Sequence, residues 1–301
     1  MKAPFFSVII PSYNRADLIG TVISSFLSQQ FSSFELIIVD DGGHDDTEKK
    51  IAEFGDERVS YIYKENGERG AARNFGSQRA KGEYITFFDS DDYAYPWFLS
   101  TAAEQLEKLG SPACYAQKFE VVSDDADFKS KKLISHPEIR TINQELLQEN
   151  ILACNGIFLR KDISATFRFS EDRTLSGSED WLLWLRIGAN FPFYYNDTIC
   201  SCLINHGGRG ELNLDPAKLK LRVLSLENNL KTDLQIHKYG KSQKKRIFVT
   251  FYTFAGQKFS QFIKFKWGSF RYFSRALYLN PGLLIKRRML AFTRSFLFVW
   301  R

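Results

Sequence analysis

The chain has 301 residues, of which 44% are hydrophobic and 15% aromatic, so its composition excludes a disordered protein and suffices for a large core. Its formal net charge is +6, but residues 234–301 contain eight lysines, seven arginines and no acidic residue, which leaves residues 1–233 with a net charge of −9. The C-terminal region is therefore electrostatically distinct from the remainder of the chain.

The first half of the chain alternates short apolar runs with segments of helical length. The apolar runs cover residues 5–10, 34–40, 58–64 and 83–89. Three segments with the apolar period of helices lie between them, at residues 17–30, 46–54 and 68–82. We expect Gly82 to end the third helix. Continuous apolar runs are typical of strands covered on both faces, so the alternation predicts an α/β fold with a doubly wound, mainly parallel sheet flanked by helices.

From about residue 93 the pattern is mixed. Helices are predicted at residues 96–110 and 178–190, and strands at residues 112–122, 155–161 and 191–204. A charged loop or hairpin is predicted at residues 124–140. Residues 213–301 are basic and aromatic with helical apolar periods, and we expect them to form a separate C-terminal helical extension.

Polar loops follow four of the predicted strands. They are Ser12 to Asn14, Asp40 to Gly42, Lys64 to Gly67 and Asp89 to Asp92. Doubly wound sheets bind ligands beyond the carboxyl ends of their strands, so these loops form the expected binding site. No GxGxxG motif follows the first strand and no GxxxxGK[ST] motif occurs, which argues against dinucleotide-dependent oxidoreductases and P-loop NTPases.

The sequence FFDSDDY at residues 87–93 ends the fourth strand in three carboxylates. Asp89, Asp91 and Asp92 repel one another unless a cation or hydrogen-bond donors compensate their charge. Because Mg²⁺ and Mn²⁺ prefer oxygen ligands, the cluster predicts a site for one of these ions. The alternative is a solvated turn, but the position at the end of a buried strand favours the metal site. Asp92 is expected to tolerate substitution best of the three.

Two neighbouring groups have two interpretations each. Asp40 and Asp41 would accept hydrogen bonds from a ribose hydroxyl or a base N–H, or would cap the helix that begins near Asp45. Arg73 is either a surface charge or, facing an acidic pocket, a contact for a base or a phosphate. The sequence around them leaves both interpretations open.

Four successive segments resemble the motifs of the family 2 glycosyltransferases, a nucleotide-sugar-dependent group with the GT-A fold. They are SVIIPSYNRADLIGTVISSFLSQQF, ELIIVDDGGHDDT, NGERGAARNFGSQRAKGEYITFFDSDDY and SEDWLLWLR. The resemblance runs in order through residues 5–206, about two thirds of the chain. It implies a GT-A catalytic domain at residues 1–212, with a nucleotide-sugar-binding half at about 1–93 and an acceptor and catalytic half at about 94–212.

The resemblance also implies roles for individual residues. Asp91, the last residue of the DxD motif, would hold an Mn²⁺ or Mg²⁺ ion that bridges the donor diphosphate, and Asp89 is expected both at this metal and on the ribose side. The other donor-binding residues are expected to be Pro11, Ser12, Tyr13, Asp40, Asp41, Asn66, Arg73 and Ser90. Gly43 departs from the family, in which serine is common at this position.

Asp180, in the ED motif that it forms with Glu179, is the expected catalytic base. Transfer with inversion requires a carboxylate that removes the acceptor proton on the face opposite the departing diphosphate, while a metal ion neutralises the leaving group. Glu179 would orient the site or the acceptor, and the reverse assignment of the two residues is the alternative. Ser178 and the two acids could also simply cap the following helix.

His206 and Arg209 follow the last predicted strand. His206 lies where many relatives carry a histidine and would complete the metal site or touch the diphosphate; the alternative is a structural or exposed histidine. Arg209 lies in a glycine-rich loop that can fold over a bound donor, so it is a candidate phosphate contact.

The basic C-terminal region carries apolar aromatic stripes at helical spacing, in residues 247–265 and 281–301. With many cations and no acidic residue, these stripes suit the anionic face of a membrane, which would bring the site near a lipid-linked acceptor. The alternative is that they pack on the catalytic domain or on a second subunit in a homodimer. Nucleic-acid binding is not expected, because no recognition motif accompanies the basic sequence.

Localisation is predicted from three features. The start of the chain is interpreted as a strand rather than an export signal, because its apolar run is short and meets Pro11. No run reaches the roughly 18 apolar residues of a membrane span. The cysteines lack paired metal-ligand spacing and are expected to be reduced thiols. We therefore expect a cytoplasmic protein that is peripheral to the inner face of the plasma membrane if the stripes bind lipid.

Together these observations predict an inverting, metal-dependent glycosyltransferase. It would move a sugar from a nucleotide donor, with UDP as the expected nucleotide, to a hydroxyl of a glycan or lipid-linked acceptor in cell-surface polysaccharide synthesis. The alternative is a noncatalytic membrane- or nucleic-acid-associated binding protein on a degenerate transferase fold. The presence of both Asp91 and Asp180 argues against that alternative.

Overall fold

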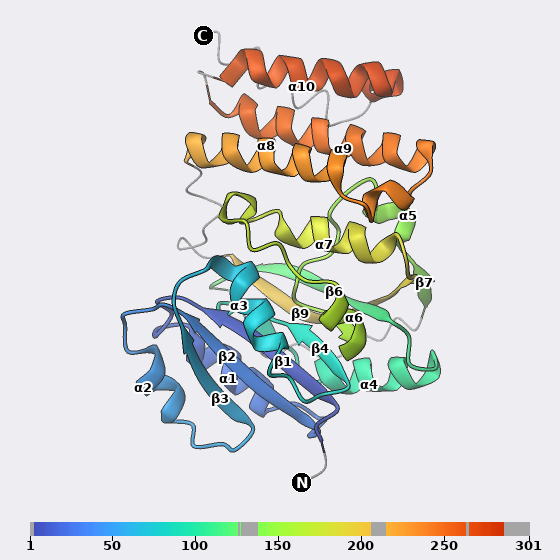
Figure 1. Cartoon of the computed structure of the whole chain (residues 1–301). Helices are drawn as coiled ribbons and strands as arrows, with labels where there is room; N and C mark the ends of the chain where they lie inside the picture. Colours follow the sequence, from blue (N-terminus) through green and yellow to red (C-terminus); the bar gives the residue numbers. More distant parts are fainter. Residues whose placement is uncertain (1–2, 126, 128–137, 206–214, 263–264, 286–301) are drawn as a thin grey trace. The chain divides into compact units, whose positions relative to one another are not determined.

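The structure is a computed structural model, and it describes residues 3–125, 127, 138–205, 215–262 and 265–285. It divides into two compact units, which Figure 1 shows in one view. The first unit comprises Met1–Asn143 and Leu152–Leu212, and the second comprises Gln144–Ile151 and Asn213–Arg301. Each unit is described separately below.

The first unit is built around one sheet, which has nine strands in the described part of the chain. The strands are β1 (Phe6–Ser12), β2 (Phe34–Asp41), β3 (Val59–Lys64), β4 (Tyr84–Phe87), β5 (Tyr93–Ala94), β6 (Cys114–Ser123), β7 (Ile139–Thr141), β8 (Ile157–Arg160) and β9 (Phe193–Asn205). Their order is β3-β2-β1-β4-β8-β6-β9-β5, and β7 pairs with β9. The first four strands run parallel, as the alternating sequence predicts. β8 is antiparallel to β4 and β6, while β6 and β9 are parallel, so the second half of the sheet is mixed.

Helices cover both faces of the parallel half of this sheet. The helices of the unit are α1 (Ile19–Leu27), α2 (Thr47–Ala52), α3 (Glu68–Ser77), α4 (Phe98–Lys108), α6 (Lys161–Thr166) and α7 (Glu179–Gly188), with a short 3₁₀ turn η1 (Arg173–Leu175). Val8 and Ile10 of β1 belong to a core that includes Phe26 of α1 and Phe98 of α4. Ile9, which alternates with them, faces α3 instead. The continuous apolar run of β1 is thus buried on both sides, as expected for a doubly wound sheet.

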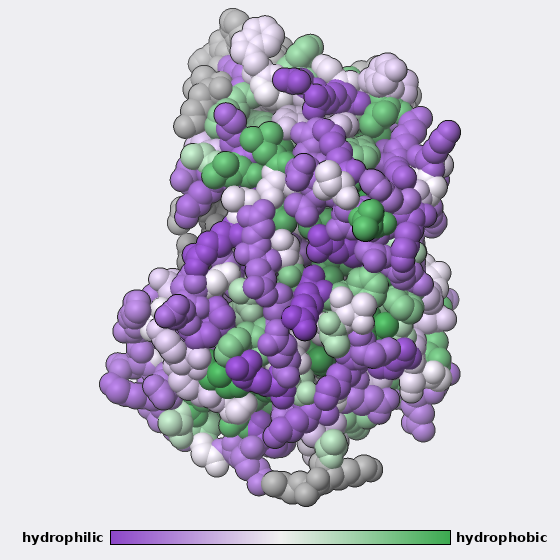
Figure 2. All heavy atoms as spheres, in the orientation of Figure 1, coloured by the Kyte–Doolittle hydropathy of each residue, from purple (hydrophilic) through white to green (hydrophobic). Residues whose placement is uncertain are grey.

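The face of the protein that Figure 2 shows is largely polar. Hydrophilic residues cover most of the face in Figure 2, and hydrophobic residues occur there as small separate patches. The apolar residues of the predicted strands are accordingly in the interior: Phe6, Leu36 and Phe87 are all buried. Burial of these runs supplies the main favourable free energy for folding of this unit.

Two glycines determine how closely the elements around α3 approach. A Cβ atom on Gly76 would lie 2.5 Å from Ile9 Cγ2 and 3.0 Å from Val39 Cγ2, so glycine is what allows α3 to contact the sheet. The prediction that Gly82 ends this helix is wrong, because the helix ends at Ser77. A Cβ atom on Gly82 would lie 2.6 Å from Ser7 N, and its amide donates a hydrogen bond to Ser7 Oγ. Gly82 thus permits close approach of the loop to β1.

Replacing Gly76 by Ala is expected to destabilise the protein by about 1–3 kcal/mol, since the added methyl group overpacks the contact between α3 and the sheet. Gly20→Ala in α1 is the matched control. Its Cβ would have Phe54 Cζ as its nearest neighbour at 3.9 Å, so it should be neutral or stabilising by up to about 1 kcal/mol. Urea unfolding measures both changes. Equal effects of the two substitutions would contradict this packing argument.

The second unit is helical. Its elements are α8 (Pro216–Thr232), η2 (Ile236–Lys238), α9 (Lys241–Ser260), α10 (Lys266–Leu279) and η4 (Pro281–Ile285), together with most of α5 (Asn143–Leu146). Residues 144–151 belong here because they bond to α9: Arg246 Nη1 donates to Gln144 Oε1 at 3.0 Å, and Thr250 Oγ1 donates to the Leu147 carbonyl at 3.0 Å. This association was not predicted from the sequence.

The aromatic stripe predicted at residues 247–265 forms part of the core of the second unit. Ile247 and Phe251 are fully buried, and the Phe251 and Tyr272 rings of α9 and α10 are 6.0 Å apart. Most of the stripe predicted at residues 281–301 lies outside the described residues. None of the helices that the structure describes combines the length and the apolar character that crossing a bilayer requires.

Candidate active site

A cavity of about 540 Å³ lies at the carboxyl ends of the parallel strands of the first unit. Most residues predicted for the site line it. They are Pro11, Ser12, Tyr13, Asp41, Asn66, Arg73, Asp89, Ser90, Asp91, Glu179 and Asp180. The cavity therefore brings together the ends of β1, β2 and β4, the start of α3 and the start of α7. His206 and Arg209 lie outside the described residues.

Asp40 does not line the cavity, in contrast to its predicted contact with the donor. Its buried carboxylate accepts hydrogen bonds from the Gly43 amide at 2.8 Å and from the Tyr61 hydroxyl at 2.8 Å. Burial and this bond raise the pKa of Tyr61, which keeps the phenol protonated as the donor. A Cβ atom on residue 43 would lie 2.7 Å from Asp40 Oδ1. Gly43 is therefore suited to this loop, although serine is common there in the family.

Asp41 connects the loop that precedes α3 to the end of β2. Its Oδ1 atom accepts from Lys64 Nζ at 2.6 Å and from the Gly67 amide at 2.9 Å. Asn66 Nδ2 donates to the Asp41 carbonyl at 2.9 Å. The start of α2 instead has Asp45, whose carboxylate accepts from the Thr47 amide. The alternative that Asp40 and Asp41 cap α2 is therefore wrong.

Ser12 offers an unused polar group at the cavity. The side chain is buried, and its Oγ atom has no hydrogen-bond partner among the described residues. A buried hydroxyl without a partner is costly unless a ligand or water completes its bonding. Because Ser12 Oγ lies on the wall of a polar cavity, it favours binding of a ligand with hydrogen-bonding groups at the end of β1.

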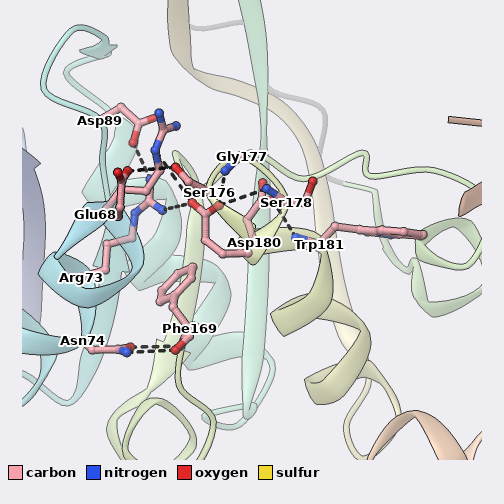
Figure 3. Close-up of polar contacts among 12 residues, drawn as sticks. Glu68, Arg73, Asn74, Asp89, Phe169, Ser176, Gly177, Ser178, Asp180 and Trp181 are labelled. Carbon is pink, nitrogen blue, oxygen red and sulfur yellow. Dashed lines mark hydrogen bonds and ion pairs between the residues drawn. The ribbon is translucent and has the colours of Figure 1, made fainter. Parts of the chain in front are cut away.

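Arg73 joins the two acidic motifs (Figure 3). Its side chain is only 2% exposed; Nη2 lies 2.8 Å from Asp89 Oδ1 and Nη1 lies 3.0 Å from Glu179 Oε1. The other oxygen of Glu179 accepts from the amides of Gly177 at 2.6 Å and Ser178 at 3.0 Å. The alternative interpretation as a surface charge is thus wrong. Two carboxylates engage the guanidinium, so these contacts hold Asp89 and Glu179 in position.

Glu179 and Asp180 differ in their surroundings. Both residues line the cavity, but Glu179 is buried and held by Arg73 and two backbone amides, whereas Asp180 is only partly buried. Asp180 Oδ1 accepts from the Trp181 amide at 2.7 Å within the first turn of α7. Ser178 precedes the helix but makes no capping bond with its side chain. Asp180 is therefore the more accessible of the two acids.

Asp89 and Asp91 fit a metal ion only together with a ligand that supplies further oxygens. Asp91 lies 3.7 Å from Arg15 Nη2 and is 12% exposed, whereas Asp89 is 31% exposed. The described residues contain no group of three acidic, histidine or cysteine side chains placed to hold a metal. Mg²⁺ sites in phosphate chemistry typically use one or two carboxylates together with substrate phosphates. The carboxylates of Asp89 and Asp91 therefore fit a metal ion that is also bound by a diphosphate.

Asp92 has a structural environment that contradicts the expectation of tolerance to substitution. It is fully buried, accepts from Asn155 Nδ2 at 2.6 Å, and accepts from the Ile204 amide at 2.9 Å. Asn155 Oδ1 in turn accepts from the Asp89 amide at 2.9 Å. Asp92 thus anchors the DxD loop to β9 and to the segment before β8, so its repulsion with Asp89 and Asp91 is offset by buried donors.

Asp92→Ala is expected to destabilise the protein by about 2–4 kcal/mol, because it leaves two buried donors without an acceptor. Asp92→Asn should cost less, since the amide oxygen can still accept one of these bonds. Thermal unfolding of the two variants gives the comparison. Wild-type stability in Asp92→Ala would restore the expectation that this position is tolerant.

Several cavity residues were not predicted as site residues. They are Arg15, Glu68, Arg69, Ala153, Cys154, Gly177 and Leu203. Arg15 and the pair Glu68–Arg69 directly follow two of the predicted polar loops. Their position next to these loops could have indicated that they belong to the site. Glu68 has φ +69°, an unusual backbone conformation for a residue with a side chain that occurs at functional sites. Ala153, Cys154 and Leu203 reach the cavity only through tertiary folding.

The cysteines are not a reactive group. All four are free and buried, which confirms the prediction of reduced thiols. Burial raises the pKa of the Cys154 thiol well above its usual range. Although Cys154 lines the cavity, its thiol is protonated near neutral pH, so it does not provide a nucleophile.

Comparison with known proteins gives several glycosyltransferases. A profile described as "Glycosyl transferase family 2" matches residues 7–167. An uncharacterized glycosyltransferase of Rickettsia conorii is 30% identical over 227 residues, which is 72% of this chain and 37% of the relative. The chain spans only about a third of the length of such rickettsial relatives.

Two shorter relatives are covered more fully. TuaG of Bacillus subtilis, a glycosyltransferase provisionally assigned to teichuronic acid biosynthesis, is 31% identical over 190 residues, 62% of this chain and 73% of the relative. WfgD of Escherichia coli is named a UDP-Glc:alpha-D-GlcNAc-diphosphoundecaprenol beta-1,3-glucosyltransferase. It is 31% identical over 182 residues, 60% of this chain and 68% of the relative.

Solved structures share the fold at low sequence identity. TarS of S. aureus in complex with UDP-GlcNAc aligns with a TM-score of 0.63 and 18% identity, over 91% of this chain and 88% of that one. The mannosyltransferase PcManGT of Pyrobaculum calidifontis, in complex with GDP-Man and Mn²⁺, aligns with a TM-score of 0.53 and 15% identity, over 93% and 88%. The α/β fold is the predicted GT-A fold. Since the family profile matches more than half of the sequence, the chain belongs to glycosyl transferase family 2.

Proposed function

We propose that the protein is an inverting, metal-dependent glycosyltransferase that uses a nucleotide sugar, with UDP as the nucleotide, in the synthesis of a cell-surface polysaccharide. The observation that carries this proposal is that one cavity is lined by both acidic motifs, Asp89 with Asp91 and Glu179 with Asp180. One pair suits a metal and a diphosphate, and the other offers a base for the acceptor.

The donor would bind at the ends of β1 and β2. Tyr13 is half exposed at the cavity and offers a ring for stacking on a base. Ser12 Oγ and Asn66 are polar groups for the base and ribose, and Asp41 is held in place by Lys64. UDP is proposed because WfgD is named for a UDP-sugar donor and a TarS structure contains UDP-GlcNAc.

Asp91, assisted by Asp89, would hold Mn²⁺ or Mg²⁺ at the diphosphate. Bound there, the ion would supply charge neutralisation for the departing nucleoside diphosphate. Arg15 lies beside Asp91 on the cavity wall and would support the diphosphate from the protein side. The Mn²⁺ in the PcManGT complex supports this assignment by analogy.

Asp180 would accept the proton of the acceptor hydroxyl. Its place in the first turn of α7 and on the cavity wall supports this role, in which a base acts on the face opposite the departing diphosphate. Glu179 would position this turn through Arg73 and the amides of Gly177 and Ser178. The two adjacent acids therefore have different tasks in this proposal.

The acceptor would be a glycan or a lipid-linked sugar. WfgD is named for a diphosphoundecaprenol-linked acceptor, and residues 234–301 are strongly basic. We therefore assign the catalytic domain to residues 1–212, with donor and acceptor halves meeting near residue 93, and assign residues 213–301 to contact with the inner face of the plasma membrane.

A thermal-shift panel of nucleotide sugars tests the donor and the metal. A UDP-sugar with Mn²⁺ should stabilise the protein by about 2.7 kcal/mol at a hundredfold excess over its Kd. EDTA or Asp91→Asn should remove the metal-dependent part of this stabilisation. Asp162→Asn, at a surface ion pair with Arg160, is the control and should retain it. Equal stabilisation with and without metal in the wild type would contradict metal dependence.

A further inference from the structure

Helix α10 has apolar side chains on two opposite faces. One face is buried against α9 and includes Phe273 and Ala276. The other face carries Trp267, Phe270 and Tyr278, which are 85%, 51% and 87% exposed. Spacings of three and eight residues place these three rings on one side of the helix. A solvent-facing helix surface is normally polar, so these exposed aromatic residues indicate an interaction surface.

Cations surround these rings. Trp267, Phe270 and Tyr278 line a shallow groove of about 730 Å³ together with Lys231, Arg271 and Arg275. Lys231 and Arg275 share Glu227 beneath the groove, at 2.8 Å and 3.1 Å. Arg271 makes no ion pair within the described part of the chain. The groove therefore combines aromatic rings with net positive charge, and its partner must supply both apolar and anionic groups.

The charge of this region argues against a two-fold symmetric contact of this face with the same face of a second copy. Residues 234–301 contain no acidic residue. A two-fold symmetric contact of this face with itself would bring Arg271 near its counterpart, and like charges oppose such a contact. Residues 286–301 are equally without acidic groups, so they do not complement the groove by charge either.

We propose that this aromatic and cationic face of α10, defined by Trp267, Phe270, Arg271, Arg275 and Tyr278, docks on an anionic lipid surface. Tryptophan and tyrosine favour the interface between water and bilayer, where the ring is buried and the polar edge is hydrated. Arginine side chains beside them bind headgroup phosphates. This inference rests on the proposed membrane contact of residues 213–301, and it assigns that contact to named residues.

Vesicle co-sedimentation of the full chain tests the assignment. The wild type should bind vesicles of equimolar phosphatidylcholine and phosphatidylglycerol more tightly than vesicles of phosphatidylcholine alone. The variant Trp267→Ser/Phe270→Ser/Tyr278→Ser should bind the mixed vesicles at least about tenfold more weakly. Arg271→Ser should weaken this binding by about fivefold, with little effect on phosphatidylcholine vesicles.

The matched control is Leu221→Ser/Leu224→Ser/Leu234→Ser, which removes three other exposed apolar side chains of the same unit, 53%, 48% and 78% exposed. It should bind like the wild type, and equal unfolding midpoints of the two triple variants would exclude loss of folding as the cause. Wild-type vesicle binding by the aromatic variant overturns the assignment to α10. A change in self-association or RNA binding alone, with vesicle binding retained, also overturns it.

The same experiment separates this inference from the proposed function. If the wild type does not bind anionic vesicles, both the α10 assignment and the proposed membrane contact fail. Stabilisation by a nucleotide sugar in that preparation would still support the transferase proposal. If the wild type binds and both triple variants bind equally well, the membrane contact stands and only the α10 assignment fails.

Discussion

Replacing Asp180 by Asn is expected to lower kcat for sugar transfer by about a thousandfold, because the amide cannot accept the proton of the acceptor hydroxyl. The substitution preserves the size of the side chain. It can also retain the hydrogen bond that Asp180 Oδ1 accepts from the Trp181 amide at 2.7 Å. The Kd of the nucleotide sugar, measured by titration calorimetry, should therefore change little. Steady-state kinetics with a saturating donor gives the loss in kcat.

The control for this experiment is Glu179→Gln. Glu179 is held by Arg73 and by two backbone amides, so its neutralisation should lower stability as well as activity. Asp180→Asn should instead retain wild-type stability. If Asp180→Asn stays active while Glu179→Gln loses the same factor in kcat without loss of stability, the roles of the two acids are reversed.

Arg73→Met is expected to destabilise the protein by about 3–5 kcal/mol, the cost of removing one partner from a buried ionic group. It would leave the buried carboxylate of Glu179 without its 3.0 Å partner, so that only Arg69 at 4.0 Å remains, and it would leave Asp89 without its 2.8 Å contact. Because both acidic motifs lose their support, activity should fall as well. Denaturant unfolding measures the change in stability.

Two further variants separate charge from geometry at this position. Arg73→Lys keeps the charge but cannot bridge both carboxylates with a planar fork, so it should have intermediate stability. Arg73→Met combined with Glu179→Gln should recover part of the loss, since no buried charge then remains unpaired. Additive destabilisation in the double variant would contradict the proposed ionic bridge.

The main features of the site could be predicted because they depend on local sequence. Buried strand residues such as Phe87 place the following acids at the carboxyl edge of a parallel sheet, and Asp89 and Asp91 lie on the cavity there. The start of α7 was predicted from its sequence pattern, and the importance of Asp180 came from the resemblance to the family. Neither required knowledge of distant contacts.

The orientation of other side chains depends on partners far away in the sequence. Asp92 turns inward to Asn155 and Ile204, and nothing near Asp92 indicates this. Arg73 was interpreted as a surface charge or a ligand contact, but Glu179 lies 106 residues away. Residues 144–151 join the second unit through bonds to α9. Local patterns predict strand ends well and tertiary partners poorly.

The most direct test of the central claim is release of nucleoside diphosphate from a panel of nucleotide sugars with Mn²⁺ and a glycan or lipid-linked acceptor. The wild type should release nucleoside diphosphate from at least one donor. Asp91→Ala and Asp180→Ala should each lower the rate by about a hundredfold or more, while Asp162→Asn should retain it. Turnover that survives both alanine substitutions in folded protein would contradict the assignment of this cavity as the active site.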